Sequence, residues 1–295
     1  MADRRPARTE ANVQADLHLL LTAAPLELTE GDLRDTVLES PAGQRRRIDV
    51  ELGQTVFEVK RDLRAGHVRE DAIQQLAGYV RDRTQSTGQR YVGVLTDGAE
   101  WELYHLDGDT LRLVTTWKID RSSPDVPGMC LWLEGVLATT SQLSPSPREI
   151  VRRLGAGSPA HLLDRAELFA LYARHRTQPT VQLKRELWAK LLTTALGTAF
   201  ADEDELFVEH TLLVNAAEII AHAVVGIDPA DPSIPALTVL EGGMFTQAQI
   251  AGVVEADFFD WVAEVEGGSA FVKTMARRLT RFNCSRTRPP SPCSV

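Results

Sequence analysis

Apolar and polar residues alternate in two short runs, about residues 45–51 and 54–60, which flank Gly53. Alternation with a period of two is typical of a β-strand with one buried face, and a glycine between two such runs indicates a turn. The two runs therefore predict a β-hairpin. Further strands are expected at Tyr91–Thr96, Glu100–Leu106 and Leu111–Ile119, the first two joined by an Asp97-Gly98 hairpin signal.

Two longer segments, residues 8–24 and 67–83, carry apolar residues at the three- and four-residue spacing of a helix face. The order of elements is then helix, strand, strand, helix, strand, strand, strand, which predicts an α/β domain over residues 1–120. The apolar helix positions are Val13, Leu17, Leu20 and Leu21 in the first segment and Val68, Ile73, Leu76 and Val80 in the second.

Residues 121–128, RSSPDVPG, have the composition of a linker. The pattern beyond them is helical, so we expect an all-helical second domain over residues 129–282. Asp202 and Glu205 have the spacing of a capping box at the start of one of its helices. The helical candidates are about residues 129–140, 147–155, 159–176, 181–197, 203–225, 246–254 and 268–282.

Composition narrows the class of protein. With 295 residues and 43% hydrophobic residues, the chain can form packed cores. Its net charge of −9 argues against a surface coated in basic charge, although a local basic cleft remains compatible. Cys130, Cys284 and Cys293 form no CxxC motif, which disfavours a disulfide framework and a structural zinc site. The sequence lacks an apolar leader and an uninterrupted apolar span, so we expect a cytoplasmic protein without a membrane partner.

Charged residues interrupt the predicted hairpin at Asp49, Glu58 and Lys60. Alternate side chains of a strand share a face, so Glu58 and Lys60 point to one side, and a tight turn brings Asp49 near Glu58. Two carboxylates held together suit Mg²⁺, which binds few protein carboxylates and keeps several waters. Lys60 can position a water molecule or neutralise developing negative charge, as hydrolysis of a nucleic-acid backbone requires.

The same residues also fit a plainer interpretation. A solvated hairpin face with an i, i+2 charge pair is the default for exposed Asp, Glu and Lys. Gln75 and Tyr79 lie one helical turn apart on the following helix, where they can brace a catalytic side chain or bind phosphate. Alternatively, Gln75 is a solvated residue and Tyr79 a half-buried aromatic of an ordinary helix.

Taken together, the pattern resembles the PD-(D/E)xK nuclease superfamily over about residues 8–120. It is most similar to the QxxxY branch found in type I restriction subunits, Mrr-like nucleases and the N-terminal domains of bifunctional type II (IIG-like) restriction–modification enzymes. The resemblance implies a restriction-endonuclease-like mixed sheet flanked by helices. It also implies that Asp49 and Glu58 bind Mg²⁺ and that Lys60 is the catalytic lysine.

The resemblance further implies that Gln75 and Tyr79 are an auxiliary catalytic pair and that Glu10 is a third metal-binding acid. Whether one or two ions are bound stays open. Asp16 and Gln14 lie on the same helix as Glu10 and are alternatives to it, since a glutamate at a helix start is favoured by the helix dipole alone. The sequence departs from the family pattern at Ile48, which takes the place of a proline that is often absent in this superfamily.

Arginines cluster around the predicted site and are candidates for contacts with DNA phosphates. For Arg45, Arg46 and Arg47, phosphate binding and pairing with acidic neighbours are both open. For Arg61 and Arg64, pairing with neighbours such as Asp62 is favoured. These five residues form the candidate DNA-binding set.

The helix at 204–226 resembles the segment that separates nuclease and adenine-N6 methyltransferase domains in bifunctional type II enzymes. A methyltransferase glycine-rich loop and an Asn/Asp-Pro-Pro-Tyr/Phe motif are absent, so we expect no S-adenosylmethionine site. Residues 283–295 are expected to be a disordered tail, native or foreign, on a chain truncated before the methyltransferase.

The resemblance therefore implies a Mg²⁺-dependent endonuclease of a restriction–modification system that acts on double-stranded DNA. The alternative is a catalytically incomplete DNA-binding or assembly fragment that works with a separate methyltransferase or specificity subunit.

Overall fold

The computed structural model describes residues 8–24, 26, 37–42, 46–137, 146–196, 200–250, 252, 254 and 256–281, and the side chains of 37–42, 46 and 47 lie outside this description. The chain divides into two compact units, residues 1–141 with 151–166 and residues 142–150 with 167–295. The predicted linker at 121–128 is therefore not the boundary, because helix α4 (Val126–Leu137) begins inside it. The predicted tail at 283–295 lies outside the described residues.

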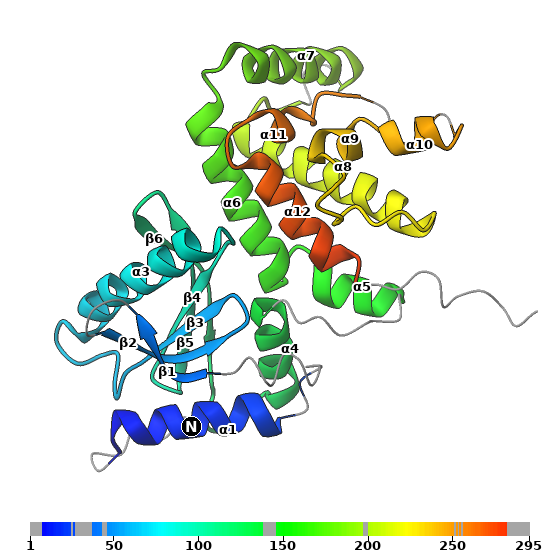
Figure 1. Cartoon of the computed structure of the whole chain (residues 1–295). Helices are drawn as coiled ribbons and strands as arrows, with labels where there is room; N and C mark the ends of the chain where they lie inside the picture. Colours follow the sequence, from blue (N-terminus) through cyan, green and yellow to red (C-terminus); the bar gives the residue numbers. More distant parts are fainter. Residues whose placement is uncertain are drawn as a thin grey trace, which may run out of the picture. The chain divides into compact units, whose positions relative to one another are not determined.

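The first unit is built on a six-stranded mixed sheet in the order β1-β2-β3-β4-β5-β6 (Figure 1). All neighbours are antiparallel except β3 and β4, which are parallel and are connected through helix α3 (Val68–Thr87). The mixed α/β class expected for this half is confirmed. The strands are β1 (Val37–Ala42), β2 (Arg46–Leu52), β3 (Thr55–Val59), β4 (Val92–Thr96), β5 (Glu100–Asp107) and β6 (Thr110–Lys118).

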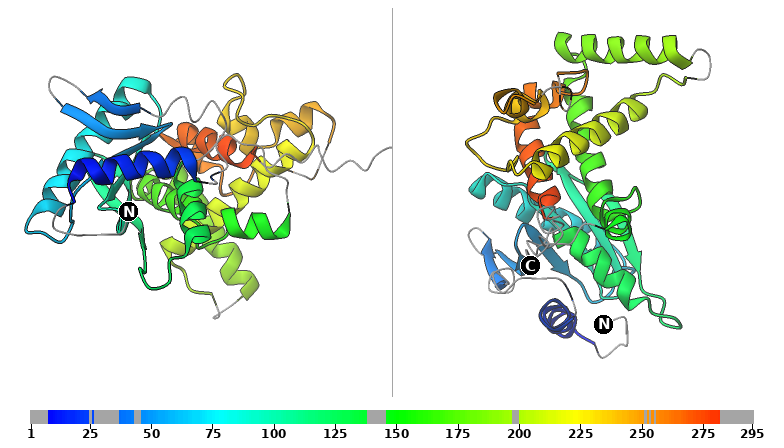
Figure 2. Two further views of the ribbon diagram at one scale, coloured as in Figure 1. Left: turned by 90° about the horizontal axis from the view of Figure 1, so that it is seen from below. Right: turned by 90° about the vertical axis from the view of Figure 1, so that its right-hand side faces the viewer.

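Helices α1 (Glu10–Ala23) and α3 pack on opposite faces of this sheet (Figures 1 and 2). Helix α1 begins with a capping box in which the Thr9 side chain accepts from the Asn12 N–H and the Asn12 side chain accepts from the Thr9 N–H. This cap satisfies N–H groups that the first turn leaves without intrahelical partners. It fixes the helix start immediately before Glu10.

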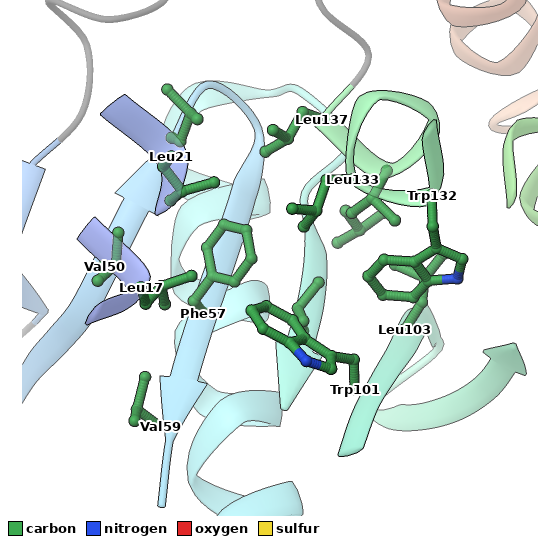
Figure 3. Packing of buried hydrophobic residues seen from close by; sticks show 14 of the residues in the cluster. Leu17, Leu21, Val50, Phe57, Val59, Trp101, Leu103, Trp132, Leu133 and Leu137 are labelled. Carbon is green, nitrogen blue, oxygen red and sulfur yellow. The ribbon is translucent and has the colours of Figure 1, made fainter. Parts of the chain in front are cut away.

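The core on the α1 side of the sheet joins α1, the central strands and α4. Trp101 of β5 meets Trp132 of α4 edge to face, with ring centroids 6.5 Å apart, and Phe57 of β3 lies between α1 and these rings (Figure 3). Such aromatic pairs add about 0.5–1.5 kcal/mol beyond the area that they bury. Helix α4 is therefore part of the first unit's core, which explains why the unit extends past residue 128.

The second unit is helical. The candidate helix at 246–254 is wrong in its bounds, because α10 ends at Gln247, and the short helices α9 and α11 were not expected. The predicted Asp202 capping box is also wrong: the N-cap of α8 is Glu203 without a side-chain bond, and Asp202 pairs with Arg185. Helices α5 (Pro147–Leu154) and α6 (Pro159–His175) are divided between the two units, whose boundaries fall at residues 150/151 and 166/167. The helices that belong entirely to the second unit are α7 (Pro179–Leu196), α8 (Asp204–Val224), α9 (Ala236–Leu240), α10 (Gly243–Gln247), α11 (Trp261–Glu264) and α12 (Gly268–Leu279).

Helix α8 is the central element of this second unit. Its buried face includes Phe207, Leu212 and Ile219 and contacts α9 and α12. Among the described residues, it is the one helix long and apolar enough to cross a bilayer, a test that core helices of water-soluble proteins also pass. The cytoplasmic location expected from the sequence stays a prediction.

The polar residues on the buried face of α8 are Thr211, Asn215, Glu218 and His222, which are 0%, 0%, 7% and 0% exposed. One carboxylate oxygen of Glu218 finds no hydrogen-bond partner within the described residues. Burial, and then the negative charges of Asp257 and Asp260, raise the pKa of Glu218 from 4.5 to about 9. The glutamate is therefore protonated in the folded chain near neutral pH.

We expect Glu218→Gln to raise the free energy of unfolding by about 1–3 kcal/mol near pH 8, because it removes a poorly satisfied buried acid. The folded wild type keeps a proton that the unfolded chain releases above a pKa of 4.5, so its stability falls as the pH rises toward about 9. Urea unfolding at about pH 4 and pH 8 measures this, with the exposed Glu205→Gln as control. If the free energy of unfolding depended on pH equally in wild type and Glu218→Gln, the raised pKa of Glu218 would be contradicted.

Candidate active site at the open end of the β2–β3 hairpin

The β2–β3 hairpin has a tight turn and a short ladder, beyond which its two strands are no longer paired. Leu52 pairs with Thr55 across a two-residue turn whose first residue, Gly53, has φ +55°, as in a type II′ turn. The ladder continues to the pair Val50–Phe57 and ends there. Asp49 and Glu58 are the first residues past this last pair, so the two acids stand where the strands part.

The alternation of β3 places Glu58 on the α3 side of the sheet. Phe57 and Val59 belong to the core on the α1 side, whereas Val56 belongs to the core under α3. Glu58 thus points away from Phe57 and Val59, as strand alternation predicts. On β2, Ile48 lies in the α3 core and Val50 in the other, so the alternation is interrupted at Asp49. The interruption coincides with the end of the ladder.

Two hydrogen bonds tie Asp49 to neighbouring elements. Its Oδ2 accepts from the Val59 N–H at 2.8 Å, which links the acid directly to the end of β3. Its main-chain carbonyl accepts from Nε2 of Gln14 at 2.7 Å, which links it to α1. The half-buried carboxylate is thus fixed where the pairing between β2 and β3 has stopped.

Glu58 is fully buried, yet one of its oxygens is unsatisfied. Oε1 accepts from Nζ of Lys60 at 2.5 Å, while Oε2 finds no hydrogen-bond donor within the described part of the chain. Burial, followed by the charge of Asp49, raises the pKa of Glu58 from 4.5 to about 7, against the lowering effect of Lys60. A buried carboxylate oxygen without a partner is costly, which makes this atom a candidate ligand for a cation.

Lys60 is held at both its main chain and its side chain. Its N–H donates to the carbonyl of Thr96 at 2.9 Å, which continues the parallel contact between β3 and β4. Burial by itself lowers the pKa of Lys60, but the bond to Glu58 and the nearby charges of Glu58, Glu10 and Asp49 raise it above 10.5. The side chain is therefore a fixed positive charge at physiological pH.

The predicted helix pair also lies at this site. Nε2 of Gln75 donates to the hydroxyl of Tyr79 at 2.8 Å, and Tyr79 is 1% exposed. Burial raises the pKa of the Tyr79 hydroxyl; the Gln75 bond opposes this, and the charges of Glu58 and Asp49 reinforce it. Tyr79 is thus within electrostatic range of both acids, and Gln75 reaches the site through it.

Glu10 is the exposed first residue of α1. Its charge is among those that raise the pKa values of Glu58 and Lys60, so the first turn of α1 lies near them. Asp16, an alternative to Glu10 on the same helix, instead forms an ion pair with Arg8 at 2.5 Å.

The structure describes the side chains of two of the five candidate DNA-binding arginines. Arg45 and the side chains of Arg46 and Arg47 lie outside the described residues. Arg61 is exposed beside the site. Exposed Arg64 forms two bonds to Asp62, from Nε at 2.9 Å and from Nη2 at 2.8 Å, as the pairing alternative expected.

The available ligands suit an ion that is bound by few protein oxygens and several waters, as Mg²⁺ commonly is, more than an ion bound by protein ligands alone. Among the described residues, no group of three or more His, Cys, Asp or Glu side chains is arranged to hold a metal ion. Asp49 and Glu58 nevertheless supply two carboxylates, one with an unpartnered oxygen. Mg²⁺ commonly uses one or two carboxylates and keeps several waters, so these residues fit a largely hydrated ion.

Two contacts at this site are not predicted by the sequence pattern. Gln14, an alternative to Glu10 in the family resemblance, lies one helical turn after it on α1 and binds the main chain of Asp49. Asp97, whose sequence context indicates only a hairpin turn, provides the other. Its Oδ2 also accepts from the Leu63 N–H at 3.2 Å, which fixes the loop after Lys60.

The chain matches no protein-family model, no curated protein and no solved structure. A functional assignment therefore depends on the geometry of these residues.

Proposed function

We propose that this chain is a Mg²⁺-dependent endonuclease of the PD-(D/E)xK type that hydrolyses phosphodiester bonds in double-stranded DNA, as part of a restriction–modification system. The observation that carries the proposal is the buried Glu58 carboxylate, with one oxygen unpartnered, beside Asp49 and Lys60 where β2 and β3 part. The order of Glu10, Asp49, Glu58-x-Lys60 and Gln75-xxx-Tyr79 on helix, strand, strand and helix supports the same family.

In this proposal Asp49 and Glu58 hold the ion, and Glu10, whose charge acts on Glu58 and Lys60, is the third acid. When bound, Mg²⁺ polarises the phosphodiester, neutralises charge on its oxygens and lowers the pKa of a coordinated water. Lys60 orients the attacking water and stabilises the negative charge that develops on the phosphorus-bound oxygens. Tyr79, braced by Gln75, is the auxiliary residue within electrostatic range of Glu58 and Lys60.

Cation binding should weaken as the pH falls through about 7, because Glu58 must lose its proton to act as a ligand. The pKa of this acid is raised, so the carboxyl is neutral below that value and charged above it. We expect the affinity for Mg²⁺ to drop about tenfold per pH unit below 7, measured by calorimetry between about pH 5.5 and 8. An affinity that is constant over this range would show that Glu58 is not a ligand.

A second candidate is a catalytically incomplete DNA-binding or assembly fragment that works with a separate methyltransferase. The ion pair between Lys60 and Glu58 favours it, because the lysine occupies one oxygen that a metal would otherwise use. In that case, DNA binding would persist while divalent ions had no effect on it.

The test is incubation of the full chain with supercoiled and linear duplex DNA, with Mg²⁺, with Mn²⁺ and with EDTA. The proposal predicts strand cleavage that depends on the ion. Intact DNA in every metal, under conditions where the chain binds DNA, would reject the endonuclease and favour the second candidate.

A further inference from the structure

We propose that Gln14 is a positioning residue of the candidate site: its side chain anchors α1 to the main chain of Asp49 and thereby sets the Asp49 carboxylate relative to Glu58. The part of this inference that concerns metal binding rests on the proposed function. The part that concerns the conformation of Asp49 rests on the hydrogen bonds alone.

Gln14 is a polar residue at the edge of an otherwise apolar contact. Helix α1 packs on the sheet through Val13, Leu17 and Leu21, all fully buried. Apolar packing permits small sliding of a helix over a sheet, because it is not directional. The 2.7 Å bond from half-buried Gln14 to the Asp49 carbonyl adds a directional contact at the site end of α1.

The anchor acts where β2 has lost its pairing to β3, although β1 still pairs with Ile48 and Val50 on the other edge of β2. The β2–β3 ladder stops at Val50–Phe57, so the next residue of β2 is not held by regular pairing to β3. Asp49 is fixed instead by Gln14 at its carbonyl and by the Val59 N–H at its carboxylate. Loss of the first bond loosens the main chain of Asp49 and, through it, the second bond.

The chemistry of glutamine suits this position. Its amide donates to a carbonyl without adding charge, and Asp49, Glu58 and Glu10 already bring three negative charges together. A glutamate at position 14 has no donor when ionised and adds a fourth negative charge. A leucine of similar size fills the space but leaves the Asp49 carbonyl without this donor.

Three variants test the inference: Gln14→Leu, Gln14→Glu, and the control Gln85→Leu, which changes an exposed glutamine of α3. Hydrogen exchange of the Val59 amide, followed by NMR, reports the Asp49 bond without any metal. We expect both Gln14 variants to exchange this amide about tenfold faster than wild type. The affinity for Mn²⁺ should fall about 10–100-fold in both, as for other residues that orient a metal ligand.

The outcomes separate this inference from the proposed function. Exchange at Val59 that is equal in Gln14→Leu, Gln14→Glu and Gln85→Leu, with all three folded, overturns the positioning role. Faster exchange in the Gln14 variants, with wild type that binds no Mn²⁺, keeps the positioning role and rejects the metal site. A general loss of stability would speed exchange across the whole first unit, so amides of β4 serve as the internal reference.

Discussion

Lys60→Met should lower the rate of Mg²⁺-dependent DNA cleavage by about 10²–10³-fold, the usual cost of removing one preorganised group that stabilises transition-state charge. Methionine keeps the apolar stem of lysine but has no ammonium to orient water or to pair with Glu58. Because Lys60 lowers the pKa of Glu58, its removal should also move any remaining activity to higher pH. Single-turnover cleavage rates between about pH 6 and 9 measure both effects.

The matched control is Lys190→Met, which changes an exposed lysine of α7 in the second unit. It should cleave at the wild-type rate. Full activity of Lys60→Met with an unchanged pH profile would contradict the role given to this lysine.

Arg153→Met should lower the free energy of unfolding of the first unit by about 3–5 kcal/mol, the usual cost of breaking a buried ion pair from one side. Nη1 of Arg153 lies 2.7 Å from a carboxylate oxygen of Glu134, with side chains that are 8% and 4% exposed. Both residues belong to the first unit, where Glu134 is on α4 and Arg153 on α5. The variant removes this cation from the buried Glu134 carboxylate.

Urea unfolding followed by tryptophan fluorescence measures this loss, because Trp101 and Trp132 report on the same core. The double variant Arg153→Met/Glu134→Leu should recover most of the stability, since it removes both buried charges of the pair. Equal stability of Arg153→Met and wild type would show that the pair adds nothing to the packing of α4.

The central strands and longest helices follow from local pattern. The alternating runs around Gly53 predict β2 and β3 because a two-residue turn and a buried face leave few other choices. Strand β1 could not be found this way, because Val37–Ala42 contains Ser40 and Pro41 and lacks alternation. It pairs with β2 through main-chain bonds, which the side-chain pattern does not record.

The end of the first unit is also not predicted by local sequence pattern. Pro124, Pro127 and Gly128 give residues 121–128 the composition of a linker. The apolar face of α4, however, packs into the core of the first unit, where Trp132 contacts Trp101. Tertiary packing thus extends the first unit beyond the segment that local composition marks as its end.

The sequence predicts the two acids and the lysine of the candidate site, but not the residues that hold them in position. The period of a strand and the tight turn predict that Asp49, Glu58 and Lys60 lie close together, and the structure places them so. The bond from Gln14 to Asp49 joins residues 35 positions apart. Such a contact depends on how α1 packs on the sheet, which local spacing does not specify.

The most direct test of the account is calorimetric titration of the full chain with Mn²⁺ and Mg²⁺ near pH 8, in wild type, Asp49→Asn, Glu58→Gln and the control Asp16→Asn. The account predicts saturable binding by wild type and Asp16→Asn, and an affinity at least about tenfold weaker in the other two. Equal affinity in all four proteins, or an absence of binding by folded wild type, would contradict the claim that Asp49 and Glu58 share one divalent cation.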